Sequence, residues 1–116
     1  MLQKMIDKQK ELQERLNAID FVDEVSRTTY IKEHAQYLDQ ELHEMLRELQ
    51  FFKKWKNYDW SYNEIVLRAD NAREEFIDAF HFMLNIAIAL KLDAEDIYRI
   101  YCYKNKINHE RQSNNY

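Results

Sequence analysis

Apolar residues recur at helical spacing along most of the chain, and they predict the first two helices. The first stripe consists of Leu2, Met5, Ile6, Leu12, Leu16 and Ile19. It predicts a helix over residues 2–19, with the polar Gln9 inside its apolar face. The second stripe alternates steps of four and three and consists of Ile31, Ala35, Leu38, Leu42, Met45, Leu49 and Phe52. This spacing indicates a helix packed in a bundle, which begins at a Ser26 or Thr28 cap and ends near residue 54.

Capping residues predict where two further helices begin. Ser61, with Glu64 three residues later, forms a capping box for a third helix that ends near Leu90. Asp93 precedes acidic residues and predicts the N-cap of a fourth helix over residues 94–109. The expected fold class is therefore all-α, a four-helix-bundle-like fold that forms a single domain over the chain.

Composition and charge narrow the possible classes of protein. The 116 residues include no glycine and no proline, so nearly every position can be helical. A net charge of −4 argues against a nucleic-acid partner, because nucleic-acid-binding domains usually carry a basic excess. No apolar run reaches the length of about 18 residues that a membrane span needs, and the single Cys102 cannot form an internal disulfide. We therefore expect a cytoplasmic protein with no membrane partner.

Apolar content also bears on the oligomeric state. Hydrophobic residues make up 46% of the chain, and the third helix is apolar around most of its circumference. Four short helices cannot cover that much apolar surface, so we expect a homodimer that completes the bundle.

The third helix nevertheless carries polar residues within the segment EEFIDAFHFMLNIAIAL. On a helical wheel these residues form one stripe, which consists of Glu74, Glu75, Asp78, His81 and Asn85. Polar groups inside an apolar helix are informative, because burying them costs free energy unless something compensates.

Two acidic pairs at helical spacing predict a metal site. Glu41 and Glu44, with Glu48 one turn further on, flank the apolar stripe of the second helix. If this helix packs beside the third, the first pair meets Glu75 and Asp78. Four carboxylates repel one another unless a cation lies between them, and oxygen ligands suit Mg²⁺. The alternative is that all of them are solvated residues on ordinary helices.

Two further groups of residues match parts of a nucleotide. On the fourth helix Tyr101, Lys104, Asn108 and Arg111 share one face, which could bind a polyphosphate or remain solvated. The side chains that could contact a pyrimidine base are Gln9, His81, Asn85, Trp55 and Trp60. An amide offers both a donor and an acceptor to the base edge, but each amide could equally be a satisfied core residue.

Taken together, these residues resemble the dimeric, all-α dUTP diphosphatases of the MazG-like superfamily of nucleotide pyrophosphatases. The resemblance spans nearly the whole chain. The segments that carry it are DKQKELQERL around Gln9, ELHEMLRELQFFKKWK (41–56), EFIDAFHF (75–82) and YCYKNKINHERQ (101–112).

The resemblance implies a MazG-type fold and a role for each group of residues. Mg²⁺ would be held by Glu41, Glu44, Glu75 and Asp78, with Glu48 adjoining them as a further catalytic carboxylate. The base and sugar would contact Gln9, Trp55, His81 and Asn85. The phosphates would contact Lys53, Lys104, Asn108 and Arg111.

The function expected from the sequence is metal-dependent hydrolysis of dUTP to dUMP and pyrophosphate. One alternative is a MazG-like pyrophosphatase that acts on dCTP or on several nucleoside triphosphates, because the acidic motifs are shared across that superfamily. Another is a non-catalytic helical interaction or regulatory protein, whose acidic stripe does not bind metal.

Overall fold

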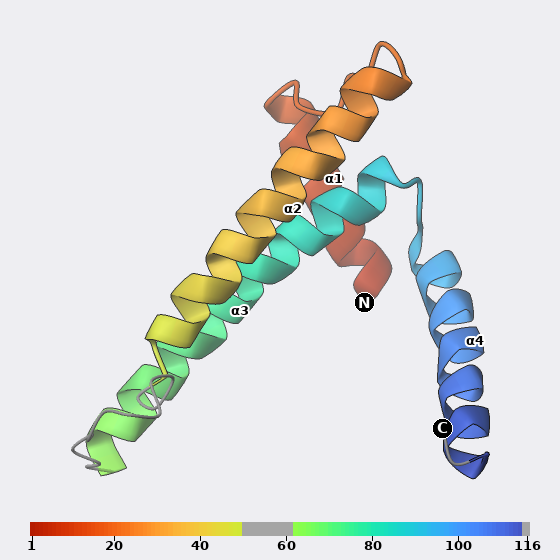
Figure 1. Cartoon of the computed structure of the whole chain (residues 1–116). Coiled ribbons are helices and arrows are strands. Elements are labelled where there is room, and N and C mark those ends of the chain that lie inside the picture. The colour runs from red at the N-terminus through yellow and green to blue at the C-terminus, as the bar shows by residue number, and fades with distance from the viewer. Residues whose placement is uncertain (50–61, 115–116) are drawn as a thin grey trace.

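The computed structural model describes residues 1–49 and 62–114 and confirms the all-α class. Within these ranges the chain forms four helices and no strand: α1 (Leu2–Arg15), α2 (Glu24–Arg47), α3 (Tyr62–Ala89) and α4 (Ala94–Ser113). The long helices α2 and α3 run antiparallel and side by side, α1 crosses them, and α4 lies apart (Figure 1). No helix of the described part combines the length and the apolar character that crossing a membrane would require.

The ends of the first two helices differ from the sequence prediction. α1 ends at Arg15 rather than near residue 19, because Asn17 takes a positive φ of 53° that stops the helix. The cap of α2 is Asp23 rather than Ser26 or Thr28. The amide of Ser26 donates to Asp23 Oδ1 (2.8 Å) and Ser26 Oγ accepts from the amide of Asp23 (3.2 Å), which forms a reciprocal capping box.

α2 also ends earlier than expected, at Arg47 instead of near residue 54. The predicted capping box of Ser61 and Glu64 lies outside the residues whose side chains are described. The start of α4 at an Asp93 cap is confirmed, since the amide of Asp96 donates to Asp93 Oδ1 (2.8 Å). α4 continues to Ser113, beyond the predicted end near residue 109.

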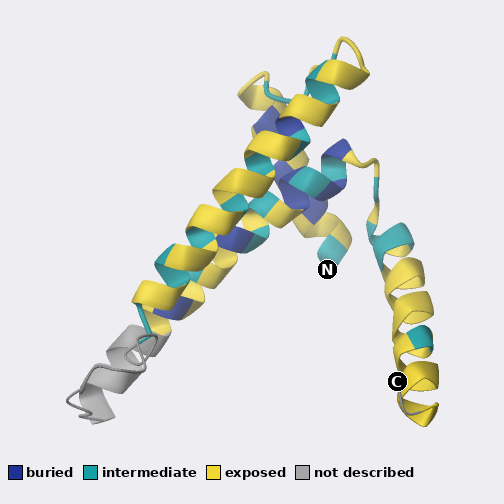
Figure 2. Ribbon diagram, in the orientation of Figure 1, coloured by how far each residue is buried: buried dark blue, intermediate teal, exposed yellow. Residues whose placement is uncertain are grey.

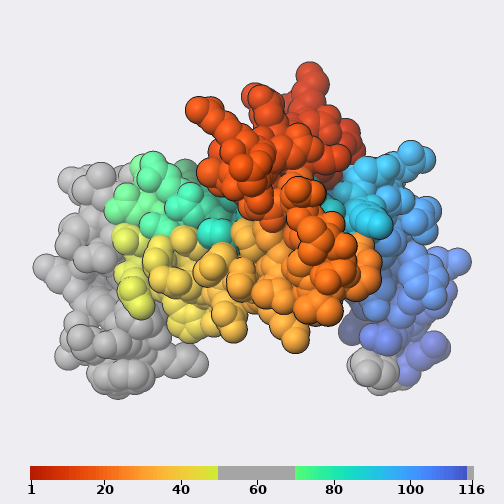
Figure 3. All heavy atoms as spheres, turned by 90° about the horizontal axis from the view of Figure 1, so that it is seen from above, coloured from red at the N-terminus to blue at the C-terminus, as the bar shows by residue number. Residues whose placement is uncertain are grey.

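The core lies where α1 crosses α2 and α3. Among the described residues, the buried apolar side chains are Ile6, Tyr30, Ala72, Ala79, Leu84, Ala87 and Ala89. In Figure 2 most of the buried segments gather at this crossing and others lie further along the α2–α3 pair, and Figure 3 shows α1 against this pair. The second apolar stripe faces this core only in part, because Ala35 and Leu42 are exposed.

α4 contributes little to this core. It contacts α1 at its first turn, where the amide of Ala94 donates to Gln3 Oε1 (2.8 Å), and it packs against neither α2 nor α3 within the described ranges. None of its residues is buried. The part of the bundle that the structure describes is therefore open, and Tyr98, Tyr101 and Tyr103 of α4 are exposed.

Candidate active site

The interface between α2 and α3 carries polar pairs at intervals of seven residues. His34 Nδ1 lies 3.2 Å from Asn85 Nδ2 at one end, and Asn71 Nδ2 donates to Glu48 Oε2 (3.3 Å) at the other. Midway between them, Glu41 lies opposite Asp78. Because seven residues make about two helical turns, these three pairs lie on one seam of the two antiparallel helices. We call this seam the polar ladder.

The central step of the polar ladder holds a group of three carboxylates. Glu41, Glu75 and Asp78 each offer an oxygen within 4.8 Å of the other two; we call them the carboxylate cluster. Ala72 and Ala79 are buried on either side of Glu75 along α3, and their small side chains allow α2 to approach closely. Glu75 Oε2 is consequently buried, and it has no hydrogen-bond partner among the described residues.

Burial and mutual repulsion disfavour negative charge in this cluster. They raise the pKa of Glu41 to about 7, through burial first and then through Glu44, Glu75 and Asp78. The pKa of Glu75 is also raised, by burial and then by the charge of Glu44. An orphaned carboxylate oxygen among further carboxylates matches the ligand set of a hard divalent cation such as Mg²⁺. The donor set of the carboxylate cluster therefore fits the metal that the sequence predicts.

A pocket of about 300 Å³ joins the carboxylate cluster to a group of buried amides. We call it the site pocket. Its lining residues come from all three packed helices and are Gln9, Leu12, Gln13, Glu41, Asp78, His81, Phe82 and Asn85. Acidic side chains thus lie on the same pocket as side chains that combine a donor with an acceptor.

The amides of the site pocket are buried and hydrogen-bonded. Gln9 Nε2 donates to Asn85 Oδ1 (2.7 Å), and these residues are only 8% and 2% exposed; we call them the amide pair. Gln13, 6% exposed, accepts at Oε1 from the hydroxyl of Tyr30 (2.8 Å). Burial raises the pKa of Tyr30 to about 12, so its hydroxyl remains a donor at neutral pH.

Sequence reasoning missed Gln13. The signal was present, because Gln13 follows Gln9 by one helical turn and therefore shares its face of α1. His34 and Tyr30, which hold the amides from α2, gave no comparable signal, since their partners are distant in sequence.

The structure brings together some of the predicted site residues but not others. Glu44 lies close enough to influence the charge of Glu41 and Glu75 but is outside the three-carboxylate group, whereas Glu48 lies further along the polar ladder. Glu74 is exposed, and His81 is exposed at the edge of the site pocket.

None of the predicted phosphate-binding residues that the structure describes lies at the site. Lys104, Asn108 and Arg111 occupy the exposed helix α4, which does not pack against the helices of the carboxylate cluster. Lys53, Trp55 and Trp60 lie outside the described residues, so their roles stay predictions.

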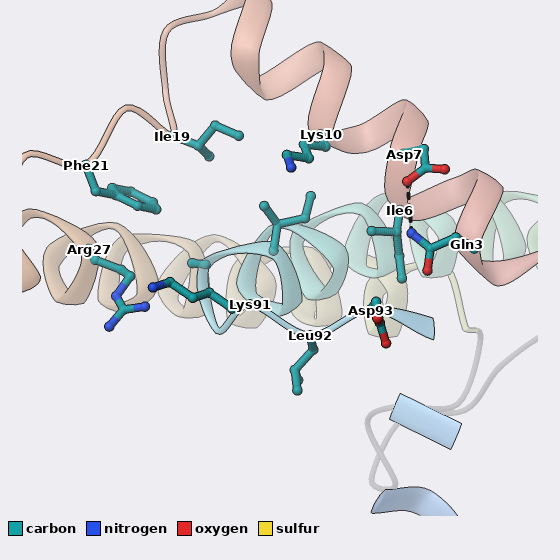
Figure 4. A pocket seen from close by; sticks show the side chains of 12 residues that line it. Gln3, Ile6, Asp7, Lys10, Ile19, Phe21, Arg27, Lys91, Leu92 and Asp93 are labelled. Carbon is teal, nitrogen blue, oxygen red and sulfur yellow. Dashed lines mark hydrogen bonds between the residues drawn. The ribbon is translucent and has the colours of Figure 1, made fainter. Parts of the chain in front are cut away.

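A second and larger hollow, of about 400 Å³, lies at the other end of α1 and lacks the chemistry of the site pocket (Figure 4). Its acidic side chains are Asp7 and Asp93. Gln3 Nε2 donates to Asp7 Oδ1 (2.9 Å), and Asp93 caps α4. Both carboxylates therefore already have partners. The carboxylate cluster and the amide pair both lie elsewhere, so we assign the candidate active site to the smaller pocket.

The chain is similar to one protein family and to several phage proteins. A sequence model described as dUTPase matches residues 1–94, which include the carboxylate cluster and the amide pair. The chain is 31% identical to the dCTP pyrophosphatase of Enterobacteria phage T4, with 99% of this chain and 82% of that protein aligned. It is 29% identical to the dCTP pyrophosphatase of Enterobacteria phage LZ5, with the same coverage. A DNA replication protein of Enterobacteria phage T4 is 28% identical over 90% of this chain and 33% of that protein. No solved structure matches the chain.

Proposed function

The chain belongs to the dUTPase family, and we propose that it is a Mg²⁺-dependent diphosphatase that hydrolyses dUTP to dUMP and pyrophosphate. The observation that carries this proposal is the site pocket, which is lined by carboxylates of the cluster and by the amide pair. A nucleoside triphosphate has a base with donors and acceptors at one end and a polyphosphate that accompanies Mg²⁺ at the other. The two kinds of lining residue match these two ends.

Each group of residues has a distinct role in the proposed reaction. Glu41, Glu75 and Asp78 would hold Mg²⁺, with Glu44 and Glu48 adjoining them. Bound Mg²⁺ would stabilise the negative charge that builds up on the reacting phosphate. Water attacks the triphosphate, a carboxylate of the site accepts its proton, and the bond between the α-phosphate and the pyrophosphate group breaks.

The amide pair would contact the base, with His81 at the pocket edge and Trp55 as further contacts to base and sugar. Uracil presents an N–H between two carbonyl oxygens, and an amide can satisfy both kinds of group. Asn85 and Gln9 are hydrogen-bonded to each other and nearly excluded from solvent, so their orientation is set before substrate binds. Such preorganisation favours selection among bases, because a wrong base leaves buried polar groups unpaired.

A second candidate substrate is dCTP. Two relatives that align along almost the whole chain are dCTP pyrophosphatases. Cytosine differs from uracil on the edge that the amide pair would contact, while the triphosphate end is the same. Hydrolysis of dCTP would therefore use the same carboxylates and differ only in how the amides are used.

We further propose that the protein acts as a homodimer. An apolar stripe that runs along α3 to the residue after its end has no partner within the described part of the chain, since Phe76, Met83 and Leu90 are 55%, 52% and 52% exposed. A second copy that covers this stripe would remove it from water. Dimerisation, or closure of α4 within one chain, would be needed to bring Lys104, Asn108 and Arg111 over the phosphates.

Pyrophosphate release from a panel of nucleotides tests the proposed function. The panel is dUTP, dCTP, dTTP and UTP, each assayed with Mg²⁺ and with an excess of chelator. We expect release from dUTP, or from dUTP and dCTP, only when Mg²⁺ is present. Metal-independent hydrolysis would contradict the role of the carboxylate cluster. Absence of turnover, together with no increase in melting temperature on adding Mg²⁺, would favour a non-catalytic helical protein.

A further inference from the structure

We propose that His34 is a positioning residue for base selection, because its Nδ1 fixes the direction in which the amides of Asn85 and Gln9 point their donors and acceptors. This inference rests on the proposed function, in which the amide pair contacts the base. His34 belongs to α2, Asn85 to α3 and Gln9 to α1, so the effect passes through one hydrogen-bonded chain across three helices.

The two hydrogen bonds that link Gln9, Asn85 and His34 run in a single direction, from donor to acceptor. Asn85 Nδ2 lies 3.2 Å from His34 Nδ1, and Asn85 Oδ1 accepts from Gln9 Nε2 (2.7 Å). Asn85 Nδ2 can only donate, so His34 Nδ1 must supply a lone pair and the ring hydrogen must reside on Nε2. Because Asn85 is 2% exposed, water does not offer its amide an alternative partner.

A hydrogen on His34 Nδ1 would reverse the direction of both hydrogen bonds, the one between His34 and Asn85 and the one between Asn85 and Gln9. A hydrogen on Nδ1 would require Asn85 to turn its oxygen toward His34 and its amino group toward Gln9. Gln9 would then turn its oxygen toward Asn85 and its amino group away from it. The pocket would therefore meet a donor at the position where Gln9 now carries an acceptor. Uracil and cytosine differ in their donors and acceptors. Uracil has an N–H and a carbonyl group at the positions where cytosine has a ring nitrogen acceptor and an amino group.

Aromatic neighbours hold the His34 ring in the plane that its hydrogen bond with Asn85 requires. Tyr30 stacks on it with a centroid distance of 3.9 Å and an interplanar angle of 27°. The rings of Tyr37 and Phe82 also lie against it, with centroid distances to the His34 ring of 5.2 Å and 5.7 Å. Burial also lowers the pKa of His34, although the charge of Glu33 partly opposes this shift. The lowered pKa favours the neutral ring. The ring is thus fixed in orientation and favoured in the form that accepts a hydrogen bond.

The test compares two substitutions that differ in the acceptor. His34→Asn retains an acceptor oxygen near the position of Nδ1, whereas His34→Leu removes it. Tyr37→Phe is the matched control, since it keeps the aromatic contact and removes only a hydroxyl that makes no hydrogen bond among the described residues. The two substrates are dUTP and dCTP. The quantity measured is kcat/KM for the substrate that the parent protein prefers, divided by kcat/KM for the other.

We expect His34→Leu to lower this ratio by about tenfold, the effect of one misdirected hydrogen bond. His34→Asn and Tyr37→Phe should keep it within about threefold. Equal losses for both substrates in His34→Leu, with the ratio unchanged, would show that His34 only supports the fold and would overturn the proposal.

A second measurement needs no substrate and no variant. Nitrogen-15 NMR of the parent protein at neutral pH should show His34 as the Nε2–H tautomer with an unprotonated Nδ1. A hydrogen on Nδ1 would overturn the inference even if the enzyme is active. Conversely, an Nε2–H tautomer in a protein that hydrolyses no pyrimidine triphosphate would contradict the proposed function and leave the hydrogen-bonded chain intact.

Discussion

Glu75 shows how neighbouring small residues can place a carboxylate where it would otherwise be unfavourable. Ala72 and Ala79 are buried beside it on the face of α3 that packs on α2. The close approach of the helices buries Glu75 Oε2 without a hydrogen-bond partner among the described residues and places the carboxylate near Glu41 and Asp78. In the absence of a cation such an arrangement costs free energy. A site that destabilises the protein in this way is expected where function requires it.

Glu75→Gln separates the proposed catalytic role of this residue from its role in the fold. The amide keeps the shape of the side chain and removes its charge, so repulsion within the carboxylate cluster decreases. We expect turnover to fall by at least about a hundredfold, as for loss of a group that stabilises transition-state charge, while the melting temperature without metal stays the same or rises. Steady-state kinetics and thermal denaturation measure the two effects. Turnover within about threefold of the parent would argue against Glu75 as a metal ligand.

The carboxylate cluster also predicts how stability depends on pH. The pKa of Glu41 is raised from 4.5 to about 7 in the folded protein, so the folded state binds this proton more tightly than the unfolded state. The resulting stabilisation is complete below about pH 4.5 and is lost as the pH rises through about 7. Metal-free protein should therefore have a lower melting temperature at pH 8 than at pH 6, and Mg²⁺ should raise it more at pH 8. Glu41→Gln should reduce this dependence, and an unchanged dependence in that variant would assign it to other groups.

At the scale of helices, the site depends on the register between α2 and α3. The polar ladder pairs His34 with Asn85, Glu41 with Asp78, and Glu48 with Asn71. A shift of either helix along the other would separate all three pairs together. One register thus brings the carboxylates together and orients the amide pair.

Local periodicity explains which of these features the sequence could predict. Helix number, the Asp93 cap and the two acidic pairs follow from spacing within single segments, and so did the amides Gln9 and Asn85. The predicted end of α1 and the predicted cap of α2 were wrong, because Asn17 ends one helix and Asp23 begins the next through backbone and side-chain geometry that several nearby residues could supply.

Most contacts between helices could not be predicted in the same way, and the meeting of Glu41 with Glu75 and Asp78 was predicted only on the condition that the second and third helices pack together. His34 meets Asn85 across 51 positions of the chain, and nothing near His34 in sequence indicates that contact. The sequence pattern of α4 likewise does not predict that this helix lies apart from α2 and α3, because an apolar face does not identify the surface that covers it.

Ala79→Leu tests whether close packing of α2 and α3 supports the site. The larger side chain overpacks the helix interface, which should cost about 1–3 kcal/mol of stability, and it should move Glu75 away from Glu41. We expect weaker Mg²⁺ binding by calorimetry and reduced turnover. Ala35→Leu is the matched control, because Ala35 is exposed on α2 and surface changes usually stay within about 0.5 kcal/mol. Unaltered Mg²⁺ affinity in Ala79→Leu would show that the carboxylates do not depend on this spacing.

At the scale of the whole molecule, a single chain leaves much apolar surface in water. Tyr98, Tyr101 and Tyr103 are exposed on α4. Phe76 and Met83 on α3 and Leu90 just past its end are also exposed, and they follow one another at intervals of seven. Such a stripe has the spacing of a helix that packs against another helix. Association of two chains would complete a bundle that one chain leaves open.

Met83→Lys should disrupt that association. A charge at the centre of a buried helical interface is costly, so the variant should sediment as a monomer of 14.3 kDa where the parent sediments at twice this mass. Gln36→Lys adds the same charge at an exposed position of α2 and should leave the dimer unchanged. A parent protein that is monomeric at micromolar concentration would exclude the dimer.

The claim that one pocket holds both ends of the substrate is tested most directly by crystallography with Mn²⁺ and a non-hydrolysable dUTP analogue. Mn²⁺ replaces Mg²⁺ among oxygen ligands, and its anomalous scattering locates it independently of the surrounding atoms. We expect an anomalous peak in contact with Glu41, Glu75 and Asp78, with the base against Gln9 and Asn85. A metal bound elsewhere, or a base outside the pocket lined by these amides, would contradict the proposed site.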